Sequence, residues 1–378
     1  LKRFLVQAAS RPARLRRAKN MTKRDCHGDV KPAVAAKAAV LGGGAFGTAM
    51  AQHLAMKGTQ VSLWVLEQEV VEGINERREN PVFLPGVQLS ERLTATRDVS
   101  EAVAGAELLL LIIPTPFIAR WLTENQTKLP WTVPLVCCSK GIEESTLRTP
   151  YEILVDELPG KYHAQLCVIS GPSFAKEVVA GLPTNVTCAS KNPEAARRVQ
   201  ALVSSRSFRV YTASDVYGAE LCGAVKNVLA IACGASDGLG FGDNARAALI
   251  TRGLAEMARL IVKKGGRATT VTGLAGVGDL VLTCSSTLSR NYTVGKSLAQ
   301  GKAAGTGQAV AEGVKTSLAL HRLTEQLGVS MPICDGVYHV LHAGVPLVKA
   351  LEALQDRALR SEEDDDLTGG GGGPAAAG

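Results

Sequence analysis

Two polar residues, Lys226 and Asn227, interrupt the small apolar run LCGAVKNVLAIACG (residues 221–234). Lysine is seldom fully buried without a partner. On a helix the neighbours of Lys226 on its own face are small and uncharged, namely Cys222, Gly223, Ala230 and Cys233. A face of this kind lets another helix or a ligand approach closely. Confinement there would lower the lysine pKa from about 10.4 to roughly 8, which suits general acid–base catalysis near neutral pH.

A buried ammonium needs an acidic partner, and Asp279 in GVGDLVLTCSSTLSRNYTVGK (residues 276–296) is the candidate. The same stretch carries Thr283, Arg290 and Asn291. Arginine offers a planar, permanently charged fork that matches a phosphate, and asparagine adds neutral donors. Two plainer interpretations stay open. Lys226 and Asp279 could form a purely structural ion pair, and Arg290 could be an exposed arginine beside a loop cap.

Polar residues also follow two buried strands. Lys140 comes just after a strand in LVCCSKGIE (residues 135–143), and Gly171 and Ser173 follow a strand in CVISGPSFAKEV (residues 167–178). In an open parallel sheet, ligands bind at the edge where the strands end. We therefore expect these two turns to face a ligand.

A dinucleotide fingerprint lies near the start of the predicted sheet. KAAVLGGGAFGTAMAQHLAMKG (residues 37–58) places Gly42, Gly44 and Gly47 in G-x-G-x-x-G register between a strand and a helix, and a second strand follows. Gly42 would make the tight turn, Gly44 would admit a pyrophosphate, and Gly47 would let helix and strand pack closely. The helix N-terminus adds free N–H groups and partial positive charge.

Glu67 ends the predicted second strand, 20 residues after Gly47. A carboxylate there accepts hydrogen bonds from a free ribose 2′-OH and repels a 2′-phosphate. Its neighbours Leu66 and Gln68 are uncharged. We therefore predict NAD as the cofactor, with NADP possible. The alternative is that Glu67 is only a solvated charge at a strand end.

The elements that must position these residues change in kind along the chain. Strand-like runs alternate with helical patterns up to about Thr212, and helical patterns follow one another after it. The predicted strands are residues 38–41, 61–65, 108–113, 135–138, 166–169, 185–189 and 208–211; the later helices are residues 215–233, 245–264, 310–326 and 345–359. This pattern predicts an α/β domain with a parallel, doubly wound, Rossmann-like sheet over residues 38–212 and an all-α domain over residues 213–358.

Charge and composition restrict the remaining possibilities. The 378 residues carry a net charge of +7, but residues 1–37 hold eleven Lys or Arg and two Asp, so the rest sums to 7 − 9 = −2. We therefore expect no nucleic-acid surface. The longest apolar run, AELLLLIIP (residues 106–114), is too short to span a membrane. The nine cysteines lack metal or disulfide spacing, which predicts no metal site and a reducing compartment.

The two ends of the chain differ from its body. The Arg-rich, acid-poor residues 1–37 resemble an organelle transit peptide, and an upstream start that is not the real one is the alternative. The segment SEEDDDLTGGGGGPAAAG cannot form a core, so residues 359–378 are expected to be a disordered tail.

Several motifs together resemble a known family. GGGAFGTAMA, CSKGIE, SGPSFAKEV, ELCGAVKNVLAIACG, NARAALITRGLAEM, GLAGVGDLVLTCSSTLSRNYTVG and AVAEGVKT occur in the order found in NAD(P)-dependent glycerol-3-phosphate dehydrogenases, over about residues 38–358. GPSF and NARAALITRGLAEM look more like the bacterial-type branch than the animal cytosolic one. The resemblance implies reversible reduction of dihydroxyacetone phosphate to sn-glycerol 3-phosphate, and a homodimer.

The resemblance also implies roles for single residues. Lys226 would be the acid/base at the C2 oxygen, positioned by Asp279 and flanked by Asn227 and Lys140, with Thr283 as a helper. Arg290 and Asn291 would bind the substrate phosphate. The implied cofactor contacts are Ala45, Phe46, Lys140, Ala175, Arg290, Val310 and Glu312. Many bacterial members have a basic residue or histidine where this chain has Leu66, which leaves the choice between NAD and NADP open.

Two other functions remain compatible with the residues. One is another lysine-dependent dehydrogenase of similar architecture, in which Arg290 would face the carboxylate of a hydroxy or keto acid. The other is a nucleotide-binding protein without catalysis. The bacterial-type motifs and the unusual chain ends favour a plastid as the compartment, with the cytoplasm second.

Overall fold

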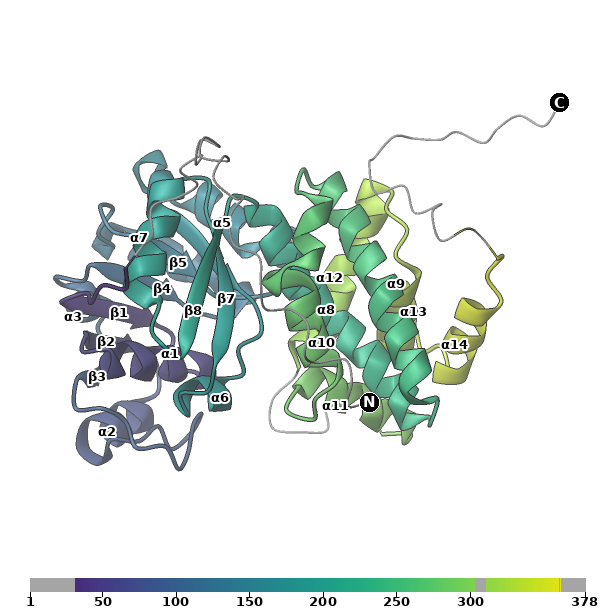
Figure 1. The fold of residues 1–378 in the computed structure, drawn as a ribbon, viewed down its shortest axis with the longest axis horizontal. Helices are drawn as coiled ribbons and strands as arrows, with labels where there is room; N and C mark the ends of the chain where they lie inside the picture. The colour runs from purple at the N-terminus through teal and green to yellow at the C-terminus, as the bar shows by residue number, and fades with distance from the viewer. Residues whose placement is uncertain (1–30, 303–310, 360, 362–378) are drawn as a thin grey trace, which may run out of the picture. The chain divides into compact units, whose positions relative to one another are not determined.

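The computed structural model describes residues 31–302, 311–359 and 361, and within them an eight-stranded sheet precedes a set of helices (Figure 1). The strands are β1 Lys37–Leu41, β2 Gln60–Trp64, β3 Leu93–Thr96, β4 Leu108–Leu111, β5 Leu135–Cys137, β6 Leu166–Ser170, β7 Thr184–Ala189 and β8 Phe208–Ala213. The helices beside the strands are α1 Ala45–Met56, α2 Gln68–Arg77, α3 Val99–Val103, α4 Ile118–Asn125, α5 Pro150–Glu157, α6 Ala175–Val179 and α7 Pro193–Val203.

The second half of the described chain is helical. Its α-helices are α8 Val216–Gly238, α9 Gly242–Lys263, α10 Asp279–Cys284, α11 Arg290–Ala299, α12 Glu312–Leu327, α13 Pro332–His342 and α14 Leu347–Gln355. The described residues also form five short helical turns: η1 Thr115–Phe117, η2 Gln126–Lys128, η3 Gly160–Gln165, η4 Ala268–Thr272 and the π-helical η5 Leu274–Gly278. The change from strand to helix falls between the end of β8 and the start of α8, close to the predicted position.

The strand order is β3-β2-β1-β4-β5-β6-β7-β8. The chain moves outward from β1 to β3 on one side, then crosses to β4 on the other side of β1. β1 and β4 therefore flank the point at which the winding reverses. Ligands of such sheets bind beyond the strand ends at this point, and the glycine-rich stretch directly follows β1.

The last two strands correct the prediction of an all-parallel sheet. β6 and β7 are antiparallel, whereas β7 and β8 are parallel to each other. A parallel crossover needs a long connection, usually a helix that runs back along the sheet. Between β6 and β7 the helix α6 has only 5 residues, so the chain re-enters the sheet in the opposite direction.

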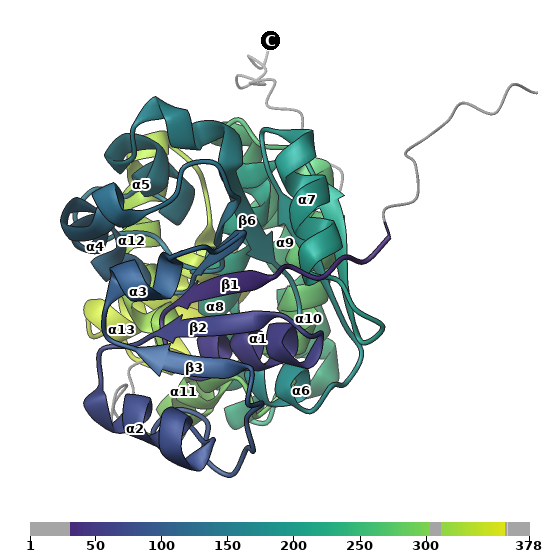
Figure 2. The same ribbon diagram turned by 90° about the vertical axis from the view of Figure 1, so that its left-hand side faces the viewer.

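Each face of the sheet is covered by its own group of helices (Figure 2). Side chains alternate along a strand, so Ala39 and Leu41 join the apolar cluster that contains α3, α4 and α5, while Ala38 and Val40 join the cluster with α1, α6 and α7. The central strands are buried on both faces, which explains their nearly continuous apolar sequences. The first cluster continues into α8, so the sheet and the helices share one core.

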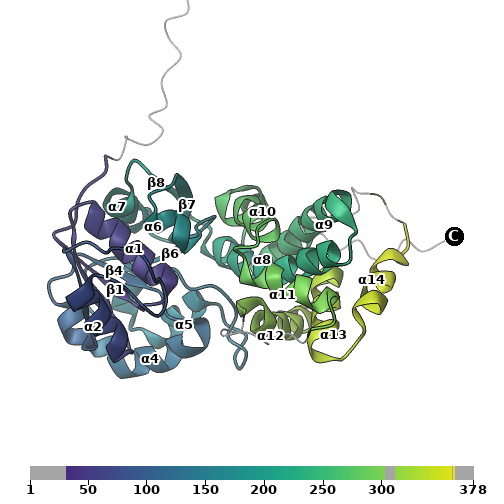
Figure 3. The same ribbon diagram turned by 90° about the horizontal axis from the view of Figure 1, so that it is seen from below.

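The helix α8 is the centre of the helical part. It contacts α9, α10, α11, α12 and α13, which surround it in Figure 3. A Cβ added at Gly234 would lie 2.0 Å from the carbonyl oxygen of Tyr292, so α8 and α11 touch backbone to backbone. By length and composition α8 is the one helix in the described chain that could cross a membrane, but most of it is buried inside the protein. Its apolar sequence therefore reflects a core helix.

Some elements differ from their predicted bounds. The short strand β3 was not predicted, because its sequence LTAT is half-exposed at the sheet edge and carries little apolar pattern. β2 ends at Trp64, so Glu67 is not in a strand; it is the residue before α2. Arg290 and Asn291 open the helix α11 after the N-cap Ser289, and Arg290 is exposed, so the plainer interpretation of Arg290 as an exposed arginine beside a cap stays open.

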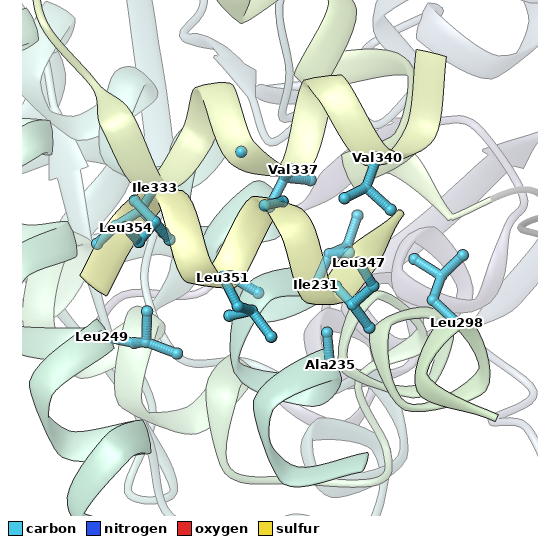
Figure 4. Close-up of a pocket in the computed structure, with 13 residues that line it drawn as sticks. Ile231, Ala235, Leu249, Leu298, Ile333, Val337, Val340, Leu347, Leu351 and Leu354 are labelled. Atoms are coloured by element: carbon cyan, nitrogen blue, oxygen red, sulfur yellow. The ribbon is translucent and has the colours of Figure 1, made fainter. Parts of the chain in front are cut away.

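A small cavity of about 30 Å³ lies under α14. Figure 4 shows Leu347, Leu351 and Leu354 of α14 in this cavity with Ile231 of α8 and Val337 of α13. Its lining is entirely apolar: Ile231, Ala232, Ala235, Leu249, Leu298, Ile333, Gly336, Val337, Val340, Leu347, Ala350, Leu351 and Leu354. It offers no group for proton transfer or anion binding, and it lies where α14 packs against the other helices.

Candidate active site

The structure joins Lys226 of α8 and Asp279 of α10 in a buried ion pair. Lys226 Nζ donates a hydrogen bond to Asp279 Oδ1 at 2.6 Å, across 53 residues of sequence. The Asp279 side chain is 1% exposed and that of Lys226 is 9% exposed. The aspartate begins α10 directly after the π-helical turn η5, a kind of irregularity often found at functional sites. The predicted partner of the lysine is therefore correct.

A second lysine shares the same carboxylate. Lys140, three residues beyond the end of β5, donates to Asp279 Oδ2 at 2.7 Å. One carboxylate thus binds two ammonium groups, so the cluster of Lys140, Lys226 and Asp279 carries a net positive charge. An anionic substrate and a developing alkoxide are both stabilised by such a charge. The lysines come from the sheet and the helical part, so the pair of contacts also fixes these two parts to each other at this point.

The two lysines titrate differently because their surroundings differ. Burial lowers the pKa of Lys226 to about 8, with the Asp279 carboxylate acting in the opposite direction and Lys140 adding to the decrease. Burial also acts to lower the pKa of Lys140, but Asp279 outweighs it and the pKa is raised. Burial tends to raise the pKa of Asp279, yet the two lysines hold it below its ordinary value. Asp279 stays ionised, and Lys226 is the group that can exchange a proton near neutral pH.

Thr283 fixes the direction in which Lys226 donates. Its hydroxyl donates to the carbonyl oxygen of Asp279 at 2.6 Å and accepts from Lys226 Nζ at 2.9 Å. An ammonium has three N–H donors. Asp279 and Thr283 take two of them, and within the described residues the third N–H of Lys226 has no acceptor. That N–H is available to a substrate oxygen.

Hydroxyl groups on neighbouring loops hold Lys140 in place. Thr115 Oγ1, in η1 after β4, donates to the carbonyl oxygen of Lys140 at 2.7 Å, and Ser139 Oγ donates to the carbonyl oxygen of Ile113. Gly141 follows at a φ of +118°, where a side chain would be strained. Lys140 was predicted from the sequence, but Thr115 and Ser139, which support it from the β4 end of the sheet, were not.

Asn227 and Asn291 form a network that links three helices. Asn291 Nδ2 donates to Asn227 Oδ1 at 2.8 Å, and Asn227 Nδ2 donates to Glu312 Oε2 at 3.3 Å. The backbone N–H of Gly313 donates to Asn291 Oδ1 at 2.9 Å. Much of the polar capacity of both amides is therefore used to join α8, α11 and α12 beside Lys226. Their predicted substrate contacts would have to use the remaining N–H groups.

Gly313 is required by this arrangement. A Cβ there would lie 2.5 Å from the carbonyl oxygen of Asn227, so only glycine lets the start of α12 reach α8. This glycine was not predicted from the sequence. Its only signal was its place beside Glu312 at the start of a helical pattern.

The turn after β6, which holds Gly171 and Ser173, lies near Lys140 and α8. Gly171 has a φ of +144° and lies against Val186, while Ser173 Oγ donates to the carbonyl oxygen of Gly171. Ser170, not selected from the sequence, is 2% exposed, and its hydroxyl has no partner within the described residues. A Cβ at Gly223 would lie 3.1 Å from Ser170 Oγ and 3.4 Å from Lys140 Cγ. The turn, α8 and Lys140 therefore meet at Gly223.

Arg290 is the first residue of α11 and is exposed, beside the buried Asn291 and after the N-cap Ser289. Within the described residues it makes no hydrogen bond or ion pair. An unpaired guanidinium at the start of a helix, one residue from the Asn227–Asn291 contact, can receive an anion. The arrangement thus places a lysine that can exchange a proton, Lys226, near an exposed guanidinium that can receive an anion.

The glycine-rich loop has the geometry that a dinucleotide pyrophosphate needs. Gly42 has a φ of +125°, and a Cβ on it would lie 2.3 Å from the carbonyl oxygen of Ile112. A Cβ on Gly47 would lie 1.8 Å from the Gly42 carbonyl oxygen, so α1 packs directly on the loop. A Cβ on Gly44 would meet nothing within 4 Å. Two glycines permit close packing, and the third leaves open space at the start of α1, where Ala45 and Phe46 form the first turn.

The other residues predicted to contact the cofactor lie around the same end of the sheet or near the Lys226–Asp279 ion pair. Glu67 is exposed and is the N-cap residue just before α2, and the Gly42 N–H donates to the carbonyl oxygen of Trp64 in β2. Ala175 begins α6, which packs against α1. Glu312 accepts a hydrogen bond from Asn227, the residue next to Lys226. Val310 lies outside the described residues.

The cysteines and histidines of the described chain have structural surroundings. The eight described cysteines are free thiols and buried, and no group of three or more His, Cys, Asp or Glu in the described chain could hold a metal ion. His342 Nε2 is 2.9 Å from Ser317 Oγ, and His321 Nδ1 is 2.9 Å from Asp335 Oδ1. These histidines belong to the packing of α12 on α13.

Comparison with protein-family models covers almost the whole described chain. Residues 37–196 match the N-terminal domain of NAD-dependent glycerol-3-phosphate dehydrogenase, and residues 215–352 match its C-terminal domain. The chain belongs to this family. The predicted family, the Rossmann-like sheet domain with a helical domain, and the class of NAD(P)-dependent oxidoreductase are confirmed.

Curated relatives agree over nearly their full lengths. The glycerol-3-phosphate dehydrogenase [NAD(P)+] of Nitratidesulfovibrio vulgaris is 50% identical over 86% of this chain and 100% of its own length. That of Geobacter sp. strain M21 is 47% identical over 87% of this chain and 99% of its own. Both relatives are bacterial, in line with the motifs that pointed to the bacterial-type branch.

Solved structures show the same architecture. The glycerol-3-phosphate dehydrogenase of Coxiella burnetii is 38% identical with a TM-score of 0.79, covering 85% of this chain and 99% of that one. The glycerol-3-phosphate dehydrogenase of Saccharomyces cerevisiae is 30% identical with a TM-score of 0.72, and the match covers 86% of this chain and 100% of that one. D-mandelate dehydrogenase, at 16% identity and a TM-score of 0.56, shares the fold alone.

Proposed function

We propose that this chain reduces the C2 carbonyl of dihydroxyacetone phosphate to sn-glycerol 3-phosphate with a nicotinamide cofactor, reversibly, and that Lys226 is the proton donor. The observation that supports this role is that the third N–H of Lys226 has no acceptor in the described part of the chain, while Asp279 and Thr283 accept from the other two N–H groups. Family membership supports the reaction. The relatives of this family are named for glycerol 3-phosphate as the substrate.

The proton chemistry follows from the lysine pair. A bound nicotinamide cofactor supplies the hydride for the carbonyl carbon. Lys226 holds the carbonyl oxygen through its third N–H, and its charge stabilises the alkoxide that develops there. The proton then passes from Nζ to that oxygen, and the neutral amine regains a proton from solvent. In the reverse direction neutral Lys226 accepts the proton of the C2 hydroxyl.

The other charged residues have positioning and binding roles in this proposal. Asp279 keeps Lys226 in place and stays ionised, while Lys140 adds a second positive charge beside the reacting oxygen. Arg290, with Asn291 at the first turn of α11, binds the phosphate. Binding energy from this non-reacting group orients the carbonyl toward the lysine.

The cofactor proposal favours NAD over NADP. Glu67 is exposed at the N-cap of α2, three residues beyond the end of the strand that borders the glycine-rich loop. Its carboxylate can accept hydrogen bonds from a ribose 2′-OH and repels a 2′-phosphate. The exposed neighbour Leu66 offers no positive charge to a 2′-phosphate.

Cofactor preference can be measured by mixing the full chain with dihydroxyacetone phosphate and either NADH or NADPH and following the loss of cofactor absorbance. NADH should be consumed with a kcat/KM at least about tenfold above that for NADPH, because like charges would meet at Glu67. Faster consumption of NADPH would contradict the role of Glu67. No consumption of either cofactor would contradict the proposed reaction.

Unphosphorylated dihydroxyacetone is the matched control substrate. It keeps the reacting carbonyl and loses the anion, so its kcat/KM should be lower by a factor of about 100 or more, since each charge-assisted hydrogen bond contributes about 1.5–3 kcal/mol. Equal activity with both ketones would contradict the phosphate-binding role of Arg290. Better activity with a keto acid would indicate instead a dehydrogenase that binds a carboxylate there.

Compartment and assembly are further proposals. Residues 1–37 are Arg-rich and acid-poor, which supports import into a plastid, with the cytoplasm as the second proposal. Residues 1–30 lie outside the described part, as do residues 360 and 362–378 of the predicted tail. A homodimer is proposed on the family resemblance. Import of a fusion of residues 1–37 to a reporter, and the mass of the purified chain in solution, test the two proposals.

A further inference from the structure

Asn80 is a completely buried polar residue that the proposed mechanism does not use. It lies in the segment after α2 and is 0% exposed. Its Nδ2 donates to the carbonyl oxygen of Gly43 at 2.9 Å and to Thr48 Oγ1 at 2.8 Å. Its Oδ1 accepts from the backbone N–H groups of Val82, at 3.3 Å, and Phe83, at 3.0 Å. Both donors and both acceptor positions of the amide are therefore occupied.

The two ends of this amide have different tasks. The oxygen end organises the turn that follows Asn80 itself, which is a local structural role. The nitrogen end reaches across 37 residues to the middle of the glycine-rich loop. Thr48 in α1 also donates to the Gly43 carbonyl oxygen, at 3.2 Å. That oxygen is thus held toward the protein interior by two side-chain donors.

The orientation of the Gly43 carbonyl sets the orientation of the next amide. In a planar trans peptide the C=O and the N–H point in opposite directions. Because the Gly43 oxygen faces Asn80 and the interior, the Gly44 N–H faces away from both. Gly44 borders open space, since a Cβ there would meet nothing within 4 Å. Within the described residues the Gly44 N–H has no acceptor, and it points outward at the start of α1.

We propose that Asn80 is a positioning residue for cofactor binding: by holding the Gly43 carbonyl inward, it aims the Gly44 N–H at the pyrophosphate of the dinucleotide. This inference rests on the proposed nicotinamide cofactor. It assigns part of the cofactor affinity to a residue that does not touch the cofactor. A glycine-rich loop can rotate its peptide planes at little cost, so a fixed external donor is needed to keep this N–H directed at the ligand.

The test is Asn80→Asp in the full chain, with the Kd for NADH and for ADP-ribose measured by titration. The substitution keeps the acceptor for Val82 and Phe83 and replaces the donor with a carboxylate, so an oxygen and its charge then face the Gly43 carbonyl oxygen. We expect both Kd values to rise about 10- to 100-fold. This rise corresponds to the loss of one charge-assisted hydrogen bond, the one from the Gly44 N–H to the pyrophosphate. ADP-ribose should be affected as strongly as NADH because both contain the pyrophosphate. The kcat at saturating NADH should stay within about threefold of wild type.

Asn75→Asp is the matched control. Asn75 also joins distant backbone groups, donating to the Ala95 carbonyl oxygen at 2.9 Å and accepting from the Ala95 N–H at 2.8 Å, but it bonds α2 to β3 and not to the loop. This variant should lose stability without a change in Kd. Should Asn80→Asp not fold, Thr48→Val removes the other donor to Gly43 and should raise both Kd values several-fold.

Three results would overturn the inference. An unchanged Kd in folded Asn80→Asp would show that the Gly43 contact is structural only, and an equal rise in Asn75→Asp would show that the effect is not specific to the loop. Failure of the wild-type chain to bind either nucleotide would overturn the inference and the proposed cofactor together. Tight nucleotide binding without turnover of dihydroxyacetone phosphate would contradict only the proposed reaction and leave the role of Asn80 supported.

Discussion

Lys226→Met will reduce the kcat for dihydroxyacetone phosphate by a factor of about 10³ or more while the Kd for NADH changes less than about threefold. A general acid contributes about 10²–10⁴ to a rate, and this lysine also supplies the positive charge that stabilises the alkoxide. Methionine keeps the length of the side chain, and Asp279 retains Lys140 as a partner. The loss should therefore reflect chemistry and not collapse of the site. Single-turnover rates and NADH titration measure the two quantities.

The matched control is Lys57→Ala. Burial lowers the pKa of Lys57 to about 8 as well, but its ammonium donates to backbone carbonyls, including that of Leu202 at 2.6 Å, and lies outside the site. Its replacement should leave turnover unchanged. Retained turnover in Lys226→Met would show that the Lys226–Asp279 contact is an ion pair without a catalytic role, the alternative that the sequence left open.

Asp279→Asn will reduce kcat by a factor of about 10²–10³ and will also destabilise the fold. The carboxylate is the shared acceptor of Lys226 and Lys140, so its loss leaves two neighbouring ammonium groups without a counter-charge and allows Lys226 to turn away from the carbonyl. Removing one partner of a buried ion pair costs about 3–5 kcal/mol of stability. Steady-state rates and thermal unfolding measure the two effects.

Asp215→Asn separates the two effects of the aspartate substitution. Asp215 caps α8, accepting from the N–H of Gly218 and, with its other oxygen, from the N–H of Arg267, and it is buried like Asp279. Its replacement should lower the unfolding temperature without lowering kcat. If Asp279→Asn kept a kcat within a few-fold of wild type, the positioning of Lys226 by Asp279 would be wrong.

The parts of this protein that could be predicted from sequence are those with a local signal. The glycine spacing at Gly42, Gly44 and Gly47 sits within one strand–helix unit. The charged Lys226 lies among small apolar residues of one predicted helix, so its unusual surroundings can be recognised from the local sequence alone. Asp279 was selected because a buried Lys226 needs an acid, and the contact is present.

What could not be predicted depends on chain segments that are far apart. The contact of Lys140 with Asp279 joins residues 139 positions apart, and nothing local shows that one carboxylate serves two lysines. In the sequence, Asn80 looks like an ordinary turn asparagine, and only the fold shows that it donates to the Gly43 carbonyl oxygen. The reversed direction of β7 depends on the short α6, and helix bounds such as that of α11 depend on close backbone packing against α8.

The pH dependence of kcat/KM in both directions tests the central proposal, proton donation by Lys226, most directly. Lys226 has a pKa of about 8 and must be charged to donate. Reduction of dihydroxyacetone phosphate should therefore fall by up to tenfold per pH unit above about pH 8. Oxidation of glycerol 3-phosphate needs the neutral amine and should rise over the same range to a plateau. A reduction rate that stays flat from about pH 7 to 10, or parallel profiles in the two directions, would contradict Lys226 as the proton donor.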